Sequence, residues 1–178
     1  MANQIRFVRE LGTAVVLGES GASGVTVALA LDALGSGSAR MSAAFDLGSQ
    51  WDQEHIVEPA IESGTAPTAG AAIDVYAAYS MDNTNWPAGV SGSEGAWPAD
   101  GNEDEWAKQL SRPIVSVIST NDANTVQRQN ATYFRPKSRY MVVVVDNNWD
   151  QSVRDQATAT DNLSRIKITP AKDYGIDP

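Results

Sequence analysis

One histidine and no cysteine limit the side chains that could act as a nucleophile, a general base or a soft metal ligand. His55 lies in the stretch "QEHIVEP", and no serine occupies a G-x-S-x-G turn of the kind that presents a nucleophile. The absence of cysteine excludes thiolate zinc sites, disulfides and cysteine nucleophiles. We therefore expect a protein that is not an enzyme, in which His55 is a polar strand residue facing solvent.

Two acidic stretches have the D-x-N-x-D spacing with which a calcium-binding loop begins. One is formed by Asp100, Asn102 and Asp104, and the other by Asp146, Asn148 and Asp150. An EF-hand loop continues to glycine at its sixth position and glutamate at its twelfth, and neither stretch does so. Asp and Asn also favour turns, which is the interpretation we prefer. No lysine follows a glycine-rich phosphate loop, so we expect neither a metal nor a cofactor.

Three of the five tryptophans, Trp86, Trp97 and Trp106, lie in one long segment, residues 82–112. Loops longer than about 15 residues are usually functional or disordered, and disordered segments are poor in aromatic residues. We expect an ordered loop whose tryptophans either stack on a sugar ring or fill a core or an interface. The large area that an aromatic ring buries favours the second role. Within this loop, residues 102–111 predict one helical turn capped by Asn102.

Alternation of apolar and polar residues dominates from residue 24 onward and predicts short strands separated by turn residues. The sequence therefore predicts an all-β protein, an antiparallel β-sandwich of jelly-roll type. Pro59 interrupts one predicted strand and places it at a sheet edge or a bulge. The predicted strands are residues 24–34, 38–48, 55–64, 71–80, 113–120, 125–130, 139–147 and 162–171.

Two of these strands carry large side chains on both faces. Tyr76 and Tyr79 fall on opposite faces of their strand, so something outside its own sheet must cover one of them. In residues 141–145, Val142 and Val144 face one side and Val143 and Val145 face the other. An apolar strand of this kind is either buried on both faces or has one face in a partner.

The length of 178 residues fits one domain, which we divide into an N-terminal arm or first strand (residues 1–23) and a jelly-roll domain (residues 24–178) with the long loop 82–112. A net charge of −9 argues against nucleic acid as a partner. The longest apolar run, residues 141–145, is far too short to span a membrane. The N-terminus lacks the pattern of a signal peptide, so we expect synthesis in the cytoplasm without export.

Three stretches occur in the order found in discoidin-like jelly rolls of the galactose-binding type: "DVYAAYSMDNTNW", "FRPKSRYMVVVVDNN" and "SRIKITPA". In that family a strand ends in Y-S-x-D-G-x-x-W, a later one reads A-R-Y-V-R-V, and the last is short and apolar. Asn83 replaces the turn glycine and also tolerates a left-handed backbone. The family's disulfide is missing here. The resemblance covers roughly residues 70–170 and implies the fold.

The small size, the absence of cysteine, the alternating Ala/Val/Gly strands and the insertion "PADGNEDEWAKQLSRPI" resemble small virion proteins of tailed bacteriophages. This resemblance implies a capsid decoration or cement protein on the exterior of the virion, made in the bacterial host cytoplasm. It implies the major capsid protein and further copies of the chain, as a homotrimer, as partners. A tail or baseplate component and a carbohydrate-binding jelly-roll module are the alternatives. The predicted interface residues are Ile5, Phe7, Trp86, Trp97 and Trp106.

Overall fold

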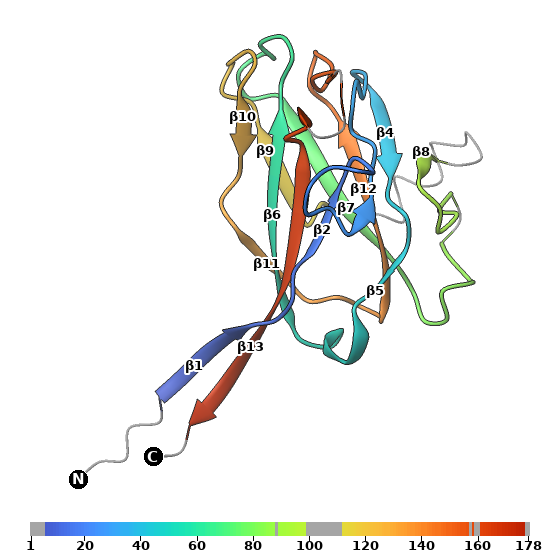
Figure 1. Cartoon of the computed structure of the whole chain (residues 1–178), viewed down its shortest axis with the longest axis vertical. Coiled ribbons are helices and arrows are strands. Elements are labelled where there is room, and N and C mark those ends of the chain that lie inside the picture. The colour runs from blue at the N-terminus through green and yellow to red at the C-terminus, as the bar shows by residue number, and fades with distance from the viewer. Residues whose placement is uncertain (1–5, 88, 99–111, 157, 159–160, 177–178) are drawn as a thin grey trace.

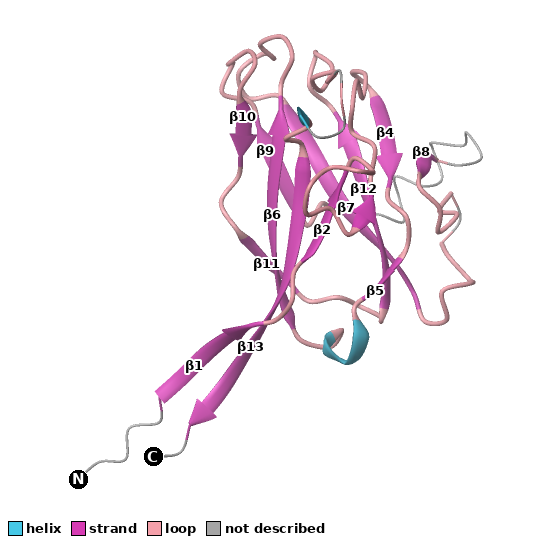
Figure 2. Cartoon of the chain, in the orientation of Figure 1, coloured by secondary structure: helices cyan, strands magenta, loops and turns pink. Residues whose placement is uncertain are grey.

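Two β-sheets packed face to face form the body of the protein (Figure 1). The structure, a computed structural model, describes residues 6–87, 89–98, 112–156, 158 and 161–176. The regular structure of these residues is almost entirely strand, with one short 3-10 helix, η1 (Gly48–Gln50), before the sixth strand (Figure 2). The prediction of an all-β, antiparallel-dominated sandwich is confirmed. No helix in the described part is long and apolar enough to cross a membrane.

The first sheet, sheet A, has the order β10-β6-β13-β2-β3, with β11 also pairing with β6 and β1 with β13. All its pairings are antiparallel except that of β2 with β3. Its strands are β1 (Arg6–Leu11), β2 (Val15–Gly18), β3 (Val27–Ala28), β6 (Glu54–Glu62), β10 (Val126–Arg128), β11 (Thr132–Phe134) and β13 (Arg165–Ile176).

The second sheet, sheet B, has the order β8-β4-β12-β7-β9, and β5 also pairs with β12. Every pairing in it is antiparallel. Its strands are β4 (Ser38–Met41), β5 (Phe45–Asp46), β7 (Ala72–Ser80), β8 (Gly95–Trp97), β9 (Val115–Ile118) and β12 (Tyr140–Asn147). The strands β2, β8 and β11 lie in segments for which the sequence pattern predicted no definite strand.

The main core lies between the two sheets and includes Trp149. Trp149 is fully buried and donates its indole N–H to the carbonyl oxygen of Val117 (3.3 Å). Each sheet contributes the side chains of alternate residues, as the pleat of a strand requires. The predicted strand at residues 24–34 is only partly present. Leu29 and Leu31 are fully buried, although only Val27 and Ala28 of that stretch form a strand.

β12 is apolar on both faces because both faces are covered. Val143 and Val145 belong to the main core, whereas Val142 and Val144 belong to a second cluster on the outer side of sheet B. The neighbouring strand β7 divides in the same way, with Tyr79 packed against the main core and Tyr76 against the outer cluster. Both sequence predictions for these strands are confirmed, and the cover comes from within the chain.

Pro59 lies in β6, an interior strand of sheet A, so of the two predicted positions, a sheet edge or a bulge, the sheet edge was wrong. On one side β6 pairs with β13 through residues 54–60. On the other side β11 pairs with residues 55–57 and β10 pairs with residues 60–62. On that side, Glu58 and Pro59 therefore have no described strand beside them. Proline has no N–H to give to a ladder, and the ladder is interrupted where proline occurs.

A two-stranded ribbon projects from one end of the sandwich (Figure 1). It consists of β1 and the outer half of β13, with Leu11 opposite Ala171 at its root and Arg6 opposite Ile176 at its far end. The inner half of β13, by contrast, lies between β6 and β2 in sheet A. One continuous strand therefore anchors the ribbon in the body of the protein.

Candidate functional site

The outer face of sheet B carries a second apolar cluster beneath the segment that follows β7. We call this segment, residues 81–87 and 89–98, the cover segment. Trp86 and Trp97, two of the predicted interface residues, are half-buried and pack against this cluster. The buried members of the cluster are Met41, Ala78, Val90, Val142 and Val144.

A polar turn directs the chain from β7 into the cover segment. The carboxylate of Asp82 accepts hydrogen bonds from the backbone N–H of Asn85 (2.8 Å) and of Thr84 (2.9 Å). These bonds hold the pKa of Asp82 well below its usual value, because they stabilise the charged form. Asn83 has a φ of 61°, in the left-handed region that asparagine tolerates. The left-handed backbone expected at Asn83 is confirmed.

The two tryptophans of the cover segment have different surroundings. Gly92 has a φ of 72°, and a Cβ placed on it would lie 2.6 Å from Nε1 of Trp86. Trp97 lies in β8, opposite Ala39 of β4, and its indole Nε1 is buried without a hydrogen-bond partner among the described residues. Their contact with a second protein stays a prediction.

The other predicted interface residues lie at or beyond the limits of the described chain. Phe7 is part of β1, where its backbone is paired opposite Gly175 in the ribbon. Ile5, Trp106 and the helical turn expected at residues 102–111 lie outside the described residues. The structure therefore brings Trp86 and Trp97 together on sheet B and puts Phe7 in the ribbon.

The acidic stretch that begins at Asp146 does not converge on one point. Asp146 lies directly opposite Asp74 on the neighbouring strand, and the amide of Asn148 donates to both carboxylates (3.1 and 3.4 Å). Asp150 turns away and accepts the N–H and the hydroxyl of Thr68 (2.8 and 2.6 Å). The other stretch, residues 100–104, is not described. Within the described residues no three His, Cys, Asp or Glu side chains gather as a metal site would require.

His55 is fully buried, so the expectation that it faces solvent was wrong. It occurs on the inward face of β6, the face that also carries Val57 and Ile61. The sequence held a signal for this, since residues two and six positions apart in a strand share a face. The ring packs against Phe134 with 5.8 Å between ring centres. Burial lowers the pKa of His55, because it penalises the charged imidazolium.

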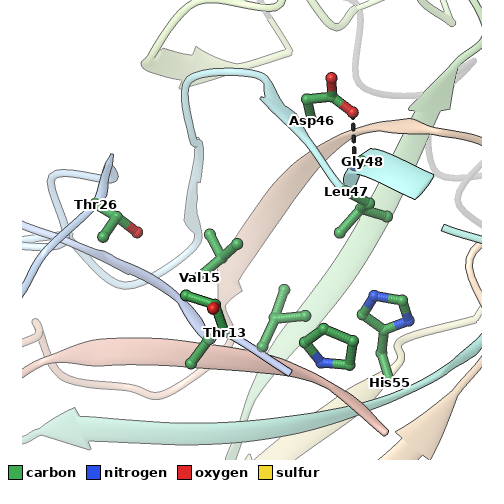
Figure 3. A pocket seen from close by; sticks show the side chains of 10 residues that line it. Thr13, Val15, Thr26, Asp46, Leu47, Gly48 and His55 are labelled. Atoms are coloured by element: carbon green, nitrogen blue, oxygen red, sulfur yellow. Dashed lines mark hydrogen bonds between the residues drawn. The ribbon is translucent and has the colours of Figure 1, made fainter. Parts of the chain in front are cut away.

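A cavity of about 360 Å³ lies beside His55, at the end of the sandwich from which the ribbon projects. Figure 3 shows the imidazole ring pointing into it beneath Leu47 and Gly48, with Val15 and Thr13 on the opposite wall. The remaining lining residues are Ala14, Thr26, Asp46, Ile168 and Pro170. The carboxylate of Asp46 already has hydrogen-bond partners: it accepts two N–H groups of Arg139 (2.8 and 2.6 Å) and the N–H of Gly48 (2.7 Å).

No known protein family, characterised protein or solved structure matches this chain. Three features of its own geometry are therefore the candidates for function. They are the ribbon, the aromatic cover of sheet B and the cavity beside His55.

Proposed function

We propose that this protein is a non-enzymatic structural component of a tailed-bacteriophage virion, a capsid decoration or cement protein. In this proposal it binds the exterior of the capsid and bridges neighbouring subunits of the major capsid protein. The observation that carries the proposal is the ribbon of β1 and the outer half of β13, which reaches away from a closed sandwich (Figure 1).

The ribbon is suited to docking because its backbone is incompletely paired. From residue 172 onward β13 pairs with β1 alone, and β1 pairs with no other described strand. Each strand of the ribbon thus has one edge of N–H and C=O groups with no partner strand in the described chain. Such an edge gains hydrogen bonds when it adds to the sheet of another protein. A projecting arm can make this addition on a neighbour while the sandwich stays on its own subunit.

The aromatic cover of sheet B supports a second contact in the same proposal. Trp86 and Trp97 are half-buried, so part of each ring remains accessible, and aromatic rings are enriched at interfaces. We propose that they contact capsid or a further copy of the chain in a homotrimer, together with Ile5, Phe7 and Trp106. The net charge of −9 supports an outward-facing protein that takes no nucleic acid as a partner. The proposal involves no membrane.

Co-sedimentation with purified capsids of the encoding phage tests this function. Removing residues 1–11 deletes β1, and we expect capsid occupancy to fall by at least about tenfold, since a docking strand is lost. Ile118→Ser is the matched control. It removes an exposed apolar side chain from β9, in the other sheet, and should leave occupancy unchanged. Raising the salt concentration should weaken binding little, because backbone pairing and buried aromatics carry it.

Equal capsid binding by the truncated and full-length chains would show that the ribbon does not dock. A full-length chain that ignores capsids and occurs at the tail would replace the decoration role with that of a tail component. Absence of the protein from purified virions would end the structural proposal.

A further inference from the structure

We propose that the cavity beside His55 is a binding site for a small, neutral organic molecule with an apolar body and one hydroxyl or N–H donor. Nε2 of His55 would accept the hydrogen bond from that donor. The site does not depend on the ribbon, because none of its lining residues belongs to β1 or to the outer half of β13. A failure of either proposal leaves the other standing.

The hydrogen bond at the other ring nitrogen fixes the chemistry of His55. Nδ1 lies 3.0 Å from the carbonyl oxygen of Gln53. A carbonyl oxygen can only accept, so in the neutral ring Nδ1 carries the proton and Nε2 presents a lone pair. Nε2 is buried and has no hydrogen-bond partner in the described part of the chain. A buried acceptor in this state favours a ligand that brings a donor.

The other polar side chains around the cavity already have partners or lie at its exposed rim. The hydroxyl of Thr26 donates to the backbone oxygen of Val16 and accepts the N–H of the same residue. Asp46 accepts from Arg139 and Gly48, and Arg139 keeps the pKa of Asp46 low and its carboxylate charged. Thr13 is exposed. The site therefore offers one buried point of polar recognition, which selects for one donor and against a charged ligand.

The size and walls of the cavity favour an organic ligand over water. A volume of about 360 Å³ falls near the lower end of the range for small-molecule sites. A buried water needs two to four polar partners, and Val15, Leu47, Ile168 and Pro170 offer apolar side chains. A molecule whose apolar body packs against these walls, and whose single donor reaches Nε2 of His55, satisfies both features at once.

Phenol and toluene form a matched pair of probes, because they have the same ring and differ by a hydroxyl in place of a methyl group. His55 is the single histidine of the chain, so its two ring nitrogens give unambiguous ¹⁵N signals. We expect the free protein to show the Nδ1–H tautomer. Phenol should shift the Nε2 signal as that atom accepts a hydrogen bond, whereas toluene should bind without this shift.

Two variants separate the hydrogen bond from the cavity. His55→Phe removes the acceptor, and the preference for phenol over toluene should fall about fivefold, the usual worth of one such bond. Ala14→Leu adds bulk at the cavity wall and should weaken both probes while the histidine signal persists. Ala123→Leu, at an exposed position in the turn between β9 and β10, is its matched control and should bind both as the native chain does.

Three results would overturn the site. The first is that neither probe perturbs the histidine signals at millimolar concentration, which would leave water as the only occupant. The second is that the preference for phenol over toluene is the same in the native chain and in His55→Phe. The third is that Ala14→Leu binds both probes as well as Ala123→Leu does, which would place binding elsewhere.

Discussion

At the scale of single residues, Gly92 lies in close contact with Trp86, which packs against the outer face of sheet B. Gly92 adopts a φ of 72°, a left-handed conformation that disfavours a side chain, and the indole of Trp86 fills the space where a Cβ would stand. Gly24 has a similar φ of 79° with nothing within 4 Å of that space. Substituting each glycine therefore distinguishes the cost of backbone strain from the cost of crowding against Trp86.

We predict that Gly92→Ala lowers the free energy of unfolding by about 2 to 3 kcal/mol, whereas Gly24→Ala lowers it by about 1 kcal/mol. Both variants strain the backbone, but only the first must displace an aromatic ring. Denaturant unfolding followed by circular dichroism measures both values, and tryptophan fluorescence should change in the Gly92 variant alone. Equal losses in the two variants would mean that Trp86 does not occupy the space above Gly92.

His55 predicts a pH dependence of stability. Its pKa lies near 6.5 in the unfolded chain and below that value in the folded protein, because burial penalises the imidazolium. Above pH 6.5 both states are neutral and the contribution to stability is complete. As the pH falls below 6.5 the unfolded chain binds the proton first, and the free energy of unfolding drops by at most about 1.4 kcal/mol per pH unit until the folded pKa is reached.

The measurement is denaturant unfolding between pH 7.5 and 5, with His55→Gln as the control that cannot titrate. Asp46, the carboxylate lining the same cavity, has a lowered pKa and loses its contribution only below pH 3.8, outside this window. The native chain should lose more stability than the variant does. Identical slopes would contradict the burial of His55.

At the scale of elements, β12 shows that a strand can have a core on either side within one chain. Val143 faces the space between the sheets, and Val142 faces the cover segment. Both side chains are fully buried. If the cover segment packs as tightly as the opposite sheet does, the two positions should respond alike to a polar change.

We predict that Val142→Thr and Val143→Thr each lower the free energy of unfolding by about 1 to 3 kcal/mol, because each buries a hydroxyl in an apolar site. Urea unfolding of the two variants measures both changes in the free energy of unfolding. A loss near zero at Val142 alone would mean that the outer face of sheet B is open to water and that the cover segment is not packed on it.

Alternation within strands was sufficient to predict the sandwich and the faces of β7 and β12, because the period of two is a local property of the chain. The same alternation indicates the burial of His55, which shares a face with Val57 and Ile61, whereas the polar residue type alone favours solvent. The interior position of β6 in sheet A could not be predicted from the local sequence. Whether β6 lies inside the sheet depends on its pairing with β10, β11 and β13, which are remote in the chain.

At the scale of the whole molecule, the ribbon joins the two ends of the described chain into one arm. Residues 6–11 pair with residues 171–176, and no local pattern encodes a register between segments so far apart in sequence. The cavity has the same origin, since Ala14, Leu47, His55 and Pro170 meet only in the fold. Residue types predicted the candidates for an interface, whereas long-range pairing determined where Phe7 and Trp97 lie in the fold.

The ribbon should be separable from the stability of the sandwich. Among the described strands β1 pairs with β13 alone, and it lies outside the two packed layers (Figure 1). We predict that removing residues 1–11 changes the free energy of unfolding of the body by less than about 1 kcal/mol, because the backbone of β1 pairs outside the packed layers and the side chain of Leu11 is exposed. Thermal unfolding of the truncated and full-length chains checks this. A collapse of the melting transition would make β1 part of the core.

The most direct test of the proposed function is a cryo-electron microscopy reconstruction of the encoding phage's capsid with the full-length chain bound. The account predicts sandwich density on the capsid exterior, grouped around local three-fold positions, with β1 or the outer half of β13 extending a sheet of the major capsid protein. A saturated capsid that lacks this density, or density in which the ribbon contacts no neighbouring chain, would contradict it.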